Sequence, residues 1–268
     1  MGIRNSSLTR VRPFFQMLIK RDPTGLSWLP KILALAPNRR LFPHEDFLTN
    51  PGLLGLVYLD NERRLNPPGE FLRWLIEHPE NMRWPKNGNA RFGADAQRWR
   101  EKLMGTRGLS GEIDKRILEI RRLDRQEAIQ EALARLAAHG AAGSFRQWWA
   151  FEGRTAVDCF LPTKRLRVYV EGKRTDVLSP STDWYPFRNQ LTRNLESARE
   201  DANGIPFACL LIAEQRLPPN MEAIIDSGLP HLRQRERQDL FHHFLGSITW
   251  REAAEATGIA YNDLPDTV

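Results

Sequence analysis

Cysteine is scarce in this chain, since only Cys159 and Cys209 occur among its 268 residues. Two cysteines cannot build the multi-bridge framework of a small secreted domain, nor a zinc site with four cysteine ligands. Both lie inside apolar, strand-like runs of the sequence. We therefore expect buried free thiols, which fit a cytoplasmic location.

Long hydrophobic runs are also missing. The longest, near residues 53–59 and 207–213, are far shorter than the ~20 apolar residues that a membrane-spanning helix needs. Residues 1–20 contain scattered arginines and no apolar segment of the secretory type, so no signal peptide is expected. Internal repeats and low-complexity segments are absent as well. These features predict a folded protein without a membrane partner.

The composition is that of an ordinary globular protein. Hydrophobic residues make up 41% and charged residues 27%, and the length is sufficient to bury a core. Lysine and arginine total 39 against 33 acidic residues, which gives a net charge of +6. This balance favours an anionic partner such as nucleic acid.

Three regions differ in their patterns. Residues 1–110 are rich in proline and tryptophan and predict a helical accessory region, with helices near 14–19, 28–36, 70–78 and 94–104 and a strand near 54–59. Residues 111–215 predict the core. Residues 216–268 predict further helices, including a short one that Thr249 caps and Gly258 ends.

The middle region alternates helices and strands in a defined order. The patterns predict a helix over 117–138, strands over 145–151, 155–161 and 166–171, a helix over 187–202 and a buried strand over 207–213. The turn between the first two strands is placed at 152–154. This α-β-β-β-α-β order predicts an α/β (α+β) fold with helices packed on a mixed sheet.

Three charged residues interrupt the apolar strands of this region. Asp158 lies within one strand, Glu171 ends the next, and Lys173 follows two residues later on the same face. If the strands pair as a hairpin, Asp158 joins the other two. Buried charges of this kind must be paired or bind a metal. The alternative is a surface ion pair of Glu171 with Lys173 or Arg174 on an edge strand.

A metal site would explain the two carboxylates. Asp158, Glu171, the Gly172 carbonyl and water form an all-oxygen ligand set that suits Mg²⁺ or Mn²⁺. Lys173 would orient the attacking water or stabilise charge on a phosphate. The chemistry that this pattern predicts is hydrolysis of a phosphodiester.

Asp158 followed by Glu171-Gly172-Lys173 resembles the D…(D/E)-x-K signature of the PD-(D/E)XK nuclease superfamily, which includes restriction endonucleases and RecB-like nucleases. That superfamily has an α-β-β-β-α-β core. The resemblance implies that Asp158 and Glu171 bind the metal and that Lys173 assists catalysis. Val157 stands where the superfamily's proline would be.

The next helix carries a second part of the resemblance. Gln190 and Asn194 occupy the positions of the Q-x-x-x-Y motif of the RecB-like branch, with asparagine in place of tyrosine. Their spacing places both on one helix face, opposite Leu191 and Leu195. Gln190 is thus a further candidate catalytic residue, and Asn194 a candidate for contact with nucleic acid.

Other side chains could contact the substrate or complete the site. Arg188 and Arg193 could meet phosphates, and Trp184 could stack on a base or merely hold its loop in place. Some superfamily members carry an acidic residue on the first core helix, for which the candidates are Glu127 and Glu131. Both could equally belong to a solvated face. Glu152 is a third candidate, for which a role in the turn is the simpler interpretation.

The sequence therefore predicts a Mg²⁺- or Mn²⁺-dependent nuclease, an endonuclease acting on DNA in preference to RNA, with a role in defence or DNA repair. One alternative is a binding module that keeps the fold but does not cut nucleic acid. Another is a protein-interaction protein whose helical regions bind a second copy or another protein.

Overall fold

A computed structural model describes residues 10–82, 102–103, 115–141, 154–173, 182, 185–217 and 220–264. Its contacts divide the chain into two compact units. The first unit combines Met1–Leu65, Thr155–Ser179 and Asn189–Val268, and the second combines Asn66–Arg154 and Pro180–Arg188. These divisions differ from the expected boundaries near residues 110 and 215, because strands distant in sequence pair within the first unit.

A mixed sheet forms the centre of the first unit. In the described part of the chain it has five strands, in the order β1-β2-β3-β4-β5. Neighbours among the first three strands are antiparallel, whereas β4 is parallel to β3 and β5 is parallel to β4. The strands are β1 (Tyr58–Leu65), β2 (Thr155–Pro162), β3 (Arg167–Gly172), β4 (Phe207–Ala213) and β5 (Phe244–Thr249). The expected α/β class and mixed sheet are confirmed.

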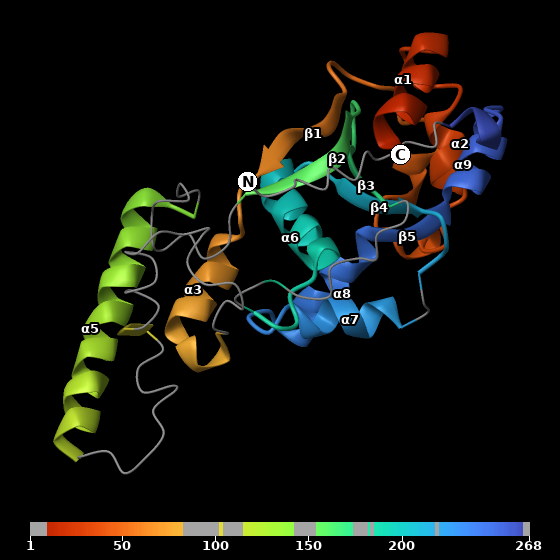
Figure 1. Cartoon of the computed structure of the whole chain (residues 1–268). Helices are drawn as coiled ribbons and strands as arrows, with labels where there is room; N and C mark the ends of the chain where they lie inside the picture. Colours follow the sequence, from red (N-terminus) through yellow and green to blue (C-terminus); the bar gives the residue numbers. More distant parts are fainter. Residues whose placement is uncertain are drawn as a thin grey trace, which may run out of the picture. The chain divides into compact units, whose positions relative to one another are not determined.

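Helices cover both faces of this sheet (Figure 1). One apolar cluster joins it to α1 (Val11–Arg21), α2 (Leu29–Ala34) and α9 (Trp250–Thr257). A second cluster joins the opposite face to α6 (Gln190–Ala202), α7 (Met221–Ser227) and α8 (Gln234–His242). The short helices η1 (Arg39–Leu41), η2 (Glu45–Leu48) and η5 (Tyr261–Asp263) belong to the same unit.

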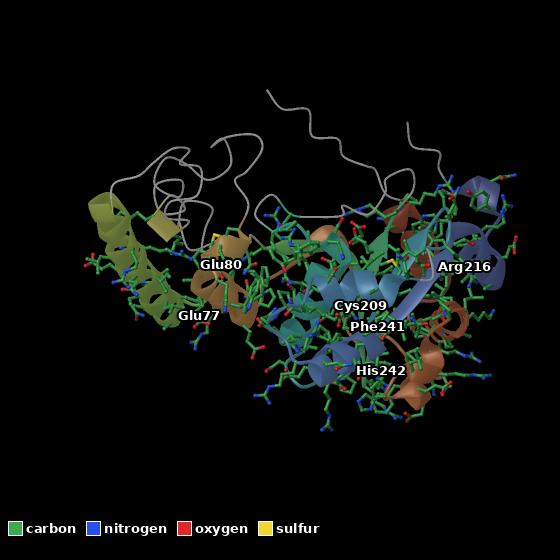
Figure 2. The ribbon with its side chains drawn as sticks, turned by 90° about the horizontal axis from the view of Figure 1, so that it is seen from below. Glu77, Glu80, Cys209, Arg216, Phe241 and His242 are labelled. Atoms are coloured by element: carbon green, nitrogen blue, oxygen red, sulfur yellow. The ribbon has the colours of Figure 1, made fainter. Side chains whose placement is uncertain are left out.

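The two cysteines are divided between these clusters. Cys159 belongs to the cluster beneath α1, and Cys209 belongs to the cluster beneath α6, where Phe241 of α8 also packs (Figure 2). Both thiols are free and buried, as the sequence predicts.

Among its described residues, the second unit contains α3 (Gly69–Glu77), α5 (Lys115–His139) and the short η3 (Pro79–Asn81). Its apolar cluster includes Phe71 and Leu75 of α3 and Ala132 and Leu136 of α5. The predicted helix over 117–138 is therefore present as α5. This helix packs within the second unit, however, and is not a helix of the sheet-containing unit.

Two strands differ from the sequence prediction. Residues 1–110 are not purely an accessory region, because β1 (Tyr58–Leu65) pairs with β2 at the edge of the sheet. The C-terminal region, expected to be helical, contributes β5 next to β4. The expected strand over 145–151 and the helix over 94–104 lie outside the described residues, except for 102–103.

Candidate active site

Asp158 and Glu171 lie side by side on adjacent antiparallel strands. The register pairs Cys159 with Val170, so the preceding residue Asp158 opposes Glu171. Their exposed fractions are only 5% and 3%. The backbone N–H of Gly172 donates to Asp158 Oδ2 at 2.8 Å, which fixes this carboxylate against the end of β3. The structure thus brings together the two carboxylates that the sequence singles out.

Three nitrogen donors surround the Glu171 carboxylate. Lys173 Nζ lies 2.7 Å from Oε1, and Gln190 Nε2 donates to the same oxygen at 2.5 Å. Asn194 Nδ2 donates to Oε2 at 2.9 Å. One of these partners follows β3 directly and the other two lie on α6, so both elements fix the orientation of the Glu171 carboxylate.

The electrostatics of the pair follow from this burial. Removal from water and the nearby Asp158 carboxylate raise the pKa of Glu171 to about 8, and the Lys173 ammonium opposes the rise. Two neighbouring carboxylates in a buried setting resist simultaneous ionisation. Added positive charge near the pair would therefore favour ionisation of both groups.

The helix α6 presents different residues to the core and to the site. Asn189 begins it, its side chain accepting a hydrogen bond from the backbone N–H of Thr192 at 2.8 Å. Leu191, Leu195 and Ala198 are buried in the sheet cluster. The predicted separation between a core face and a face that carries Gln190 and Asn194 is thus present.

Gly172 lies where helices on the other face pack directly against the sheet. A Cβ atom there would overlap the Val11 side chain of α1 and lie 3.1 Å from the Trp250 ring of α9. The Trp250 indole N–H also donates to the Lys173 carbonyl oxygen at 2.9 Å. The backbone that carries the Glu171-Gly172-Lys173 sequence is thereby anchored from behind.

The residues predicted to contact nucleic acid differ in their positions. Asn194 is buried and hydrogen-bonded to Glu171, so it supports the site from within instead of facing solvent. Arg188 is fully buried in the second unit, with its guanidinium 3.7 Å from the Phe71 ring centroid, and such a side chain is not available to a phosphate. Arg193 is partly exposed on α6. Trp184 lies outside the described residues.

Two of the acidic candidates for completing the site belong to the second unit. Glu127 and Glu131 are on α5 in the second unit, where Glu131 pairs with Arg135 at 2.7 Å. That pair agrees with the solvated-face alternative. Glu152 is outside the described residues.

Sequence reasoning overlooked Thr155. This residue begins β2 and is 5% exposed, and its hydroxyl lies 2.6 Å from Asn194 Oδ1. The signal was weak, since threonine is common in strands. Thr155 lies three residues before Asp158 and is not part of the sequence motif described above.

No protein-family model, no curated protein and no solved structure matches this chain. No described helix combines the length and apolar composition needed to cross a membrane. Among residues whose positions are described, no three or more histidine, cysteine, aspartate or glutamate side chains are grouped to hold a metal ion. Asp158 and Glu171 therefore form a pair of carboxylates that is not part of such a larger group.

Proposed function

We propose that this protein is a metal-dependent nuclease that hydrolyses phosphodiester bonds, with DNA favoured over RNA. The observation that carries the proposal is the buried pair Asp158 and Glu171, with Lys173 Nζ 2.7 Å from Glu171. Burying such charged groups in an apolar sheet has a large desolvation penalty. Groups of this kind cluster at functional sites, and a catalytic metal site accounts for this one.

The residues fit Mg²⁺ or Mn²⁺ better than a transition metal. Asp158 and Glu171 offer carboxylate oxygens alone, which hard divalent cations prefer. Mg²⁺ commonly binds through one or two carboxylates and retains several waters, so two acidic side chains suffice. The raised pKa of Glu171 supports this fit, because it marks a site where added positive charge is favourable. Participation of the Gly172 carbonyl stays a prediction.

The side chains have distinct tasks in this proposal. A Mg²⁺ ion held by Asp158 and Glu171 would supply polarisation of a phosphoryl oxygen and a bound water of lowered pKa. Asp158 and Glu171 hold the cation, and Gln190 orients the Glu171 carboxylate. Lys173 shares its ammonium between Glu171 and the reacting phosphate, where it stabilises the developing negative charge.

The element order supports a restriction-endonuclease-like core. In the first unit, α1, α2, η1 and η2 precede β1-β2-β3-α6-β4. The β-β-β-α-β part of this order agrees with the core of the superfamily that the sequence resembles, and more than one helix precedes it. Residues of the second unit are inserted between β1 and β2. The net charge of +6 also agrees with a polyanionic substrate.

The proposal is tested with labelled single- and double-stranded DNA and RNA, incubated with Mg²⁺, Mn²⁺ or EDTA. We expect cleavage of DNA that needs the metal and disappears in the Asp158→Asn variant. Asparagine keeps an acceptor for the Gly172 N–H, so this variant should fold normally. Glu255→Gln, on the exposed side of α9, is the matched control. Metal-dependent cleavage by well-folded Asp158→Asn protein would refute the assignment.

A second function is favoured by one specific observation. Lys173, Gln190 and Asn194 already provide partners for both oxygens of Glu171, so this side chain has hydrogen-bond partners in the fold without a metal. This agrees with a nucleic-acid-binding module that does not cut. Salt-dependent DNA binding without cleavage and without a calorimetric signal for Mg²⁺ or Mn²⁺ would support that function instead.

A further inference from the structure

Thr155 and Asn194 form a buried hydrogen bond next to the carboxylate pair. The two side chains are 5% and 3% exposed, and Thr155 Oγ1 lies 2.6 Å from Asn194 Oδ1. An amide oxygen can only accept a hydrogen bond, so the threonine hydroxyl is the donor. The contact therefore fixes which end of the Asn194 amide faces β2.

The other end of the same amide faces Glu171. Asn194 Nδ2 donates to Glu171 Oε2 at 2.9 Å. In the ionised form of Glu171, which is the form that would bind a metal, a turned amide would place Oδ1 against Oε2. Two acceptors would then meet in a buried space. Because Thr155 donates to Oδ1, it favours the orientation in which Asn194 donates to Glu171.

We infer that Thr155 is a positioning residue that, through Asn194, holds the Glu171 carboxylate in the orientation needed to bind a divalent metal. This inference rests on the proposed function. Thr155 contacts neither the proposed metal nor the substrate, and its effect passes through a chain of two hydrogen bonds. Gln190 and Lys173 hold Oε1 independently, so loss of Thr155 should loosen Glu171 without releasing it.

The experiment compares Thr155→Val with Thr155→Ser in the full-length protein. Valine keeps the shape of the side chain and removes its hydroxyl, whereas serine keeps the hydroxyl and removes a methyl group. Thr192→Val is the matched control, since Thr192 is a fully buried threonine on α6 whose hydroxyl has no hydrogen-bond partner among the described residues. The measurements are Mg²⁺ and Mn²⁺ binding by calorimetry, kcat and KM on DNA, and melting without metal.

We expect Thr155→Val to weaken metal binding and lower kcat, each on the order of 10-fold, as is typical when an outer partner of a metal ligand is lost. The KM for DNA should stay unchanged. Thr155→Ser should restore both values, and Thr192→Val should match the parent. In an Asn194→Ala background, Thr155→Val should add no further loss of metal affinity.

Two results would overturn the inference while leaving the proposed function intact. One is a Thr155→Val protein with the parent's metal affinity and kcat. The other is a Thr155→Ser protein as impaired as Thr155→Val, which would assign the effect to packing of the methyl group. If valine prevents folding, Thr155→Ala removes the hydroxyl without adding a methyl group and permits the same comparison. A parent that neither binds metal nor cuts would overturn the proposed function and this inference together.

Discussion

The two sides of strand β3 differ: one packs apolar side chains into the core, and the other carries the Glu171 carboxylate of the candidate site. Val168 and Val170 point into the apolar cluster beneath α1, α2 and α9. Tyr169 and Glu171 alternate with them and face α6. On one side the strand contributes only hydrophobic contacts, whereas on the other it carries a buried carboxylate with three nitrogen donors. The apolar side of β3 thus fixes the strand in the core, and the opposite side carries the residues of the candidate site.

The same contrast recurs on α6, and it can be tested there with the largest expected effect. Leu195 is fully buried in the sheet cluster, so Leu195→Ala should lower the free energy of unfolding by about 2–5 kcal/mol. Gln190→Ala removes one hydrogen bond to Glu171 and should cost roughly 1 kcal/mol while cleavage falls. Denaturant unfolding and a cleavage rate for each variant provide the check. Early unfolding with normal cleavage for Gln190→Ala would mean that the two sides of α6 are assigned the wrong way round.

Lys173 gives the next largest effect, on catalysis. Lys173→Met removes the ammonium 2.7 Å from Glu171 and should reduce turnover by about 100-fold, a typical loss for one preorganised electrostatic contact. The KM for DNA should change little, because in the proposed function Lys173 stabilises charge on the reacting phosphate and does not bind the rest of the DNA. Lys164→Met, at the exposed turn between β2 and β3, is the control. Equal turnover in both variants would leave Lys173 as the partner of an ion pair only.

How much of this could be read from the sequence depends on the range of the interactions. Alternation within a strand and spacing within a helix are local, so Asp158, Glu171 and the two sides of α6 could be predicted. The pairing of β1 with β2 joins residues 58–65 to 155–162, and no local pattern reports a contact over that distance. The strand β5 was missed although Phe244, Leu245 and Ile248 are typical of a buried strand. The burial of Arg188 could not be predicted either, because it depends on a contact with Phe71, which is distant in the sequence.

The pH dependence of stability offers a smaller test of the contrast between the two sides of β3. The pKa of Glu171 in the folded protein is raised to about 8, so the folded state holds this proton more tightly than the unfolded chain does. The resulting stabilisation is complete below the ordinary carboxyl pKa of about 4.3 and is lost as the pH rises through about 8. The melting temperature of metal-free protein should therefore fall over this range more than that of Glu171→Gln. Parallel curves for the two proteins would show that Glu171 ionises as an ordinary carboxyl group.

Arg193 should give the smallest effect, and it tests whether the side of α6 that carries Gln190 extends into a nucleic-acid surface. Arg193 lies three residues after Gln190 on the helix and is partly exposed, so the proposed function predicts that it contacts a phosphate of bound DNA. Each phosphate contact to duplex DNA contributes about 0.9 to the slope of log affinity against log salt concentration. Arg193→Ala should thus weaken binding at low salt and reduce that slope by about one. Arg235→Ala removes an exposed arginine of α8 and serves as the control for net charge. Equal slopes for the two variants would confine this side of α6 to the support of Glu171.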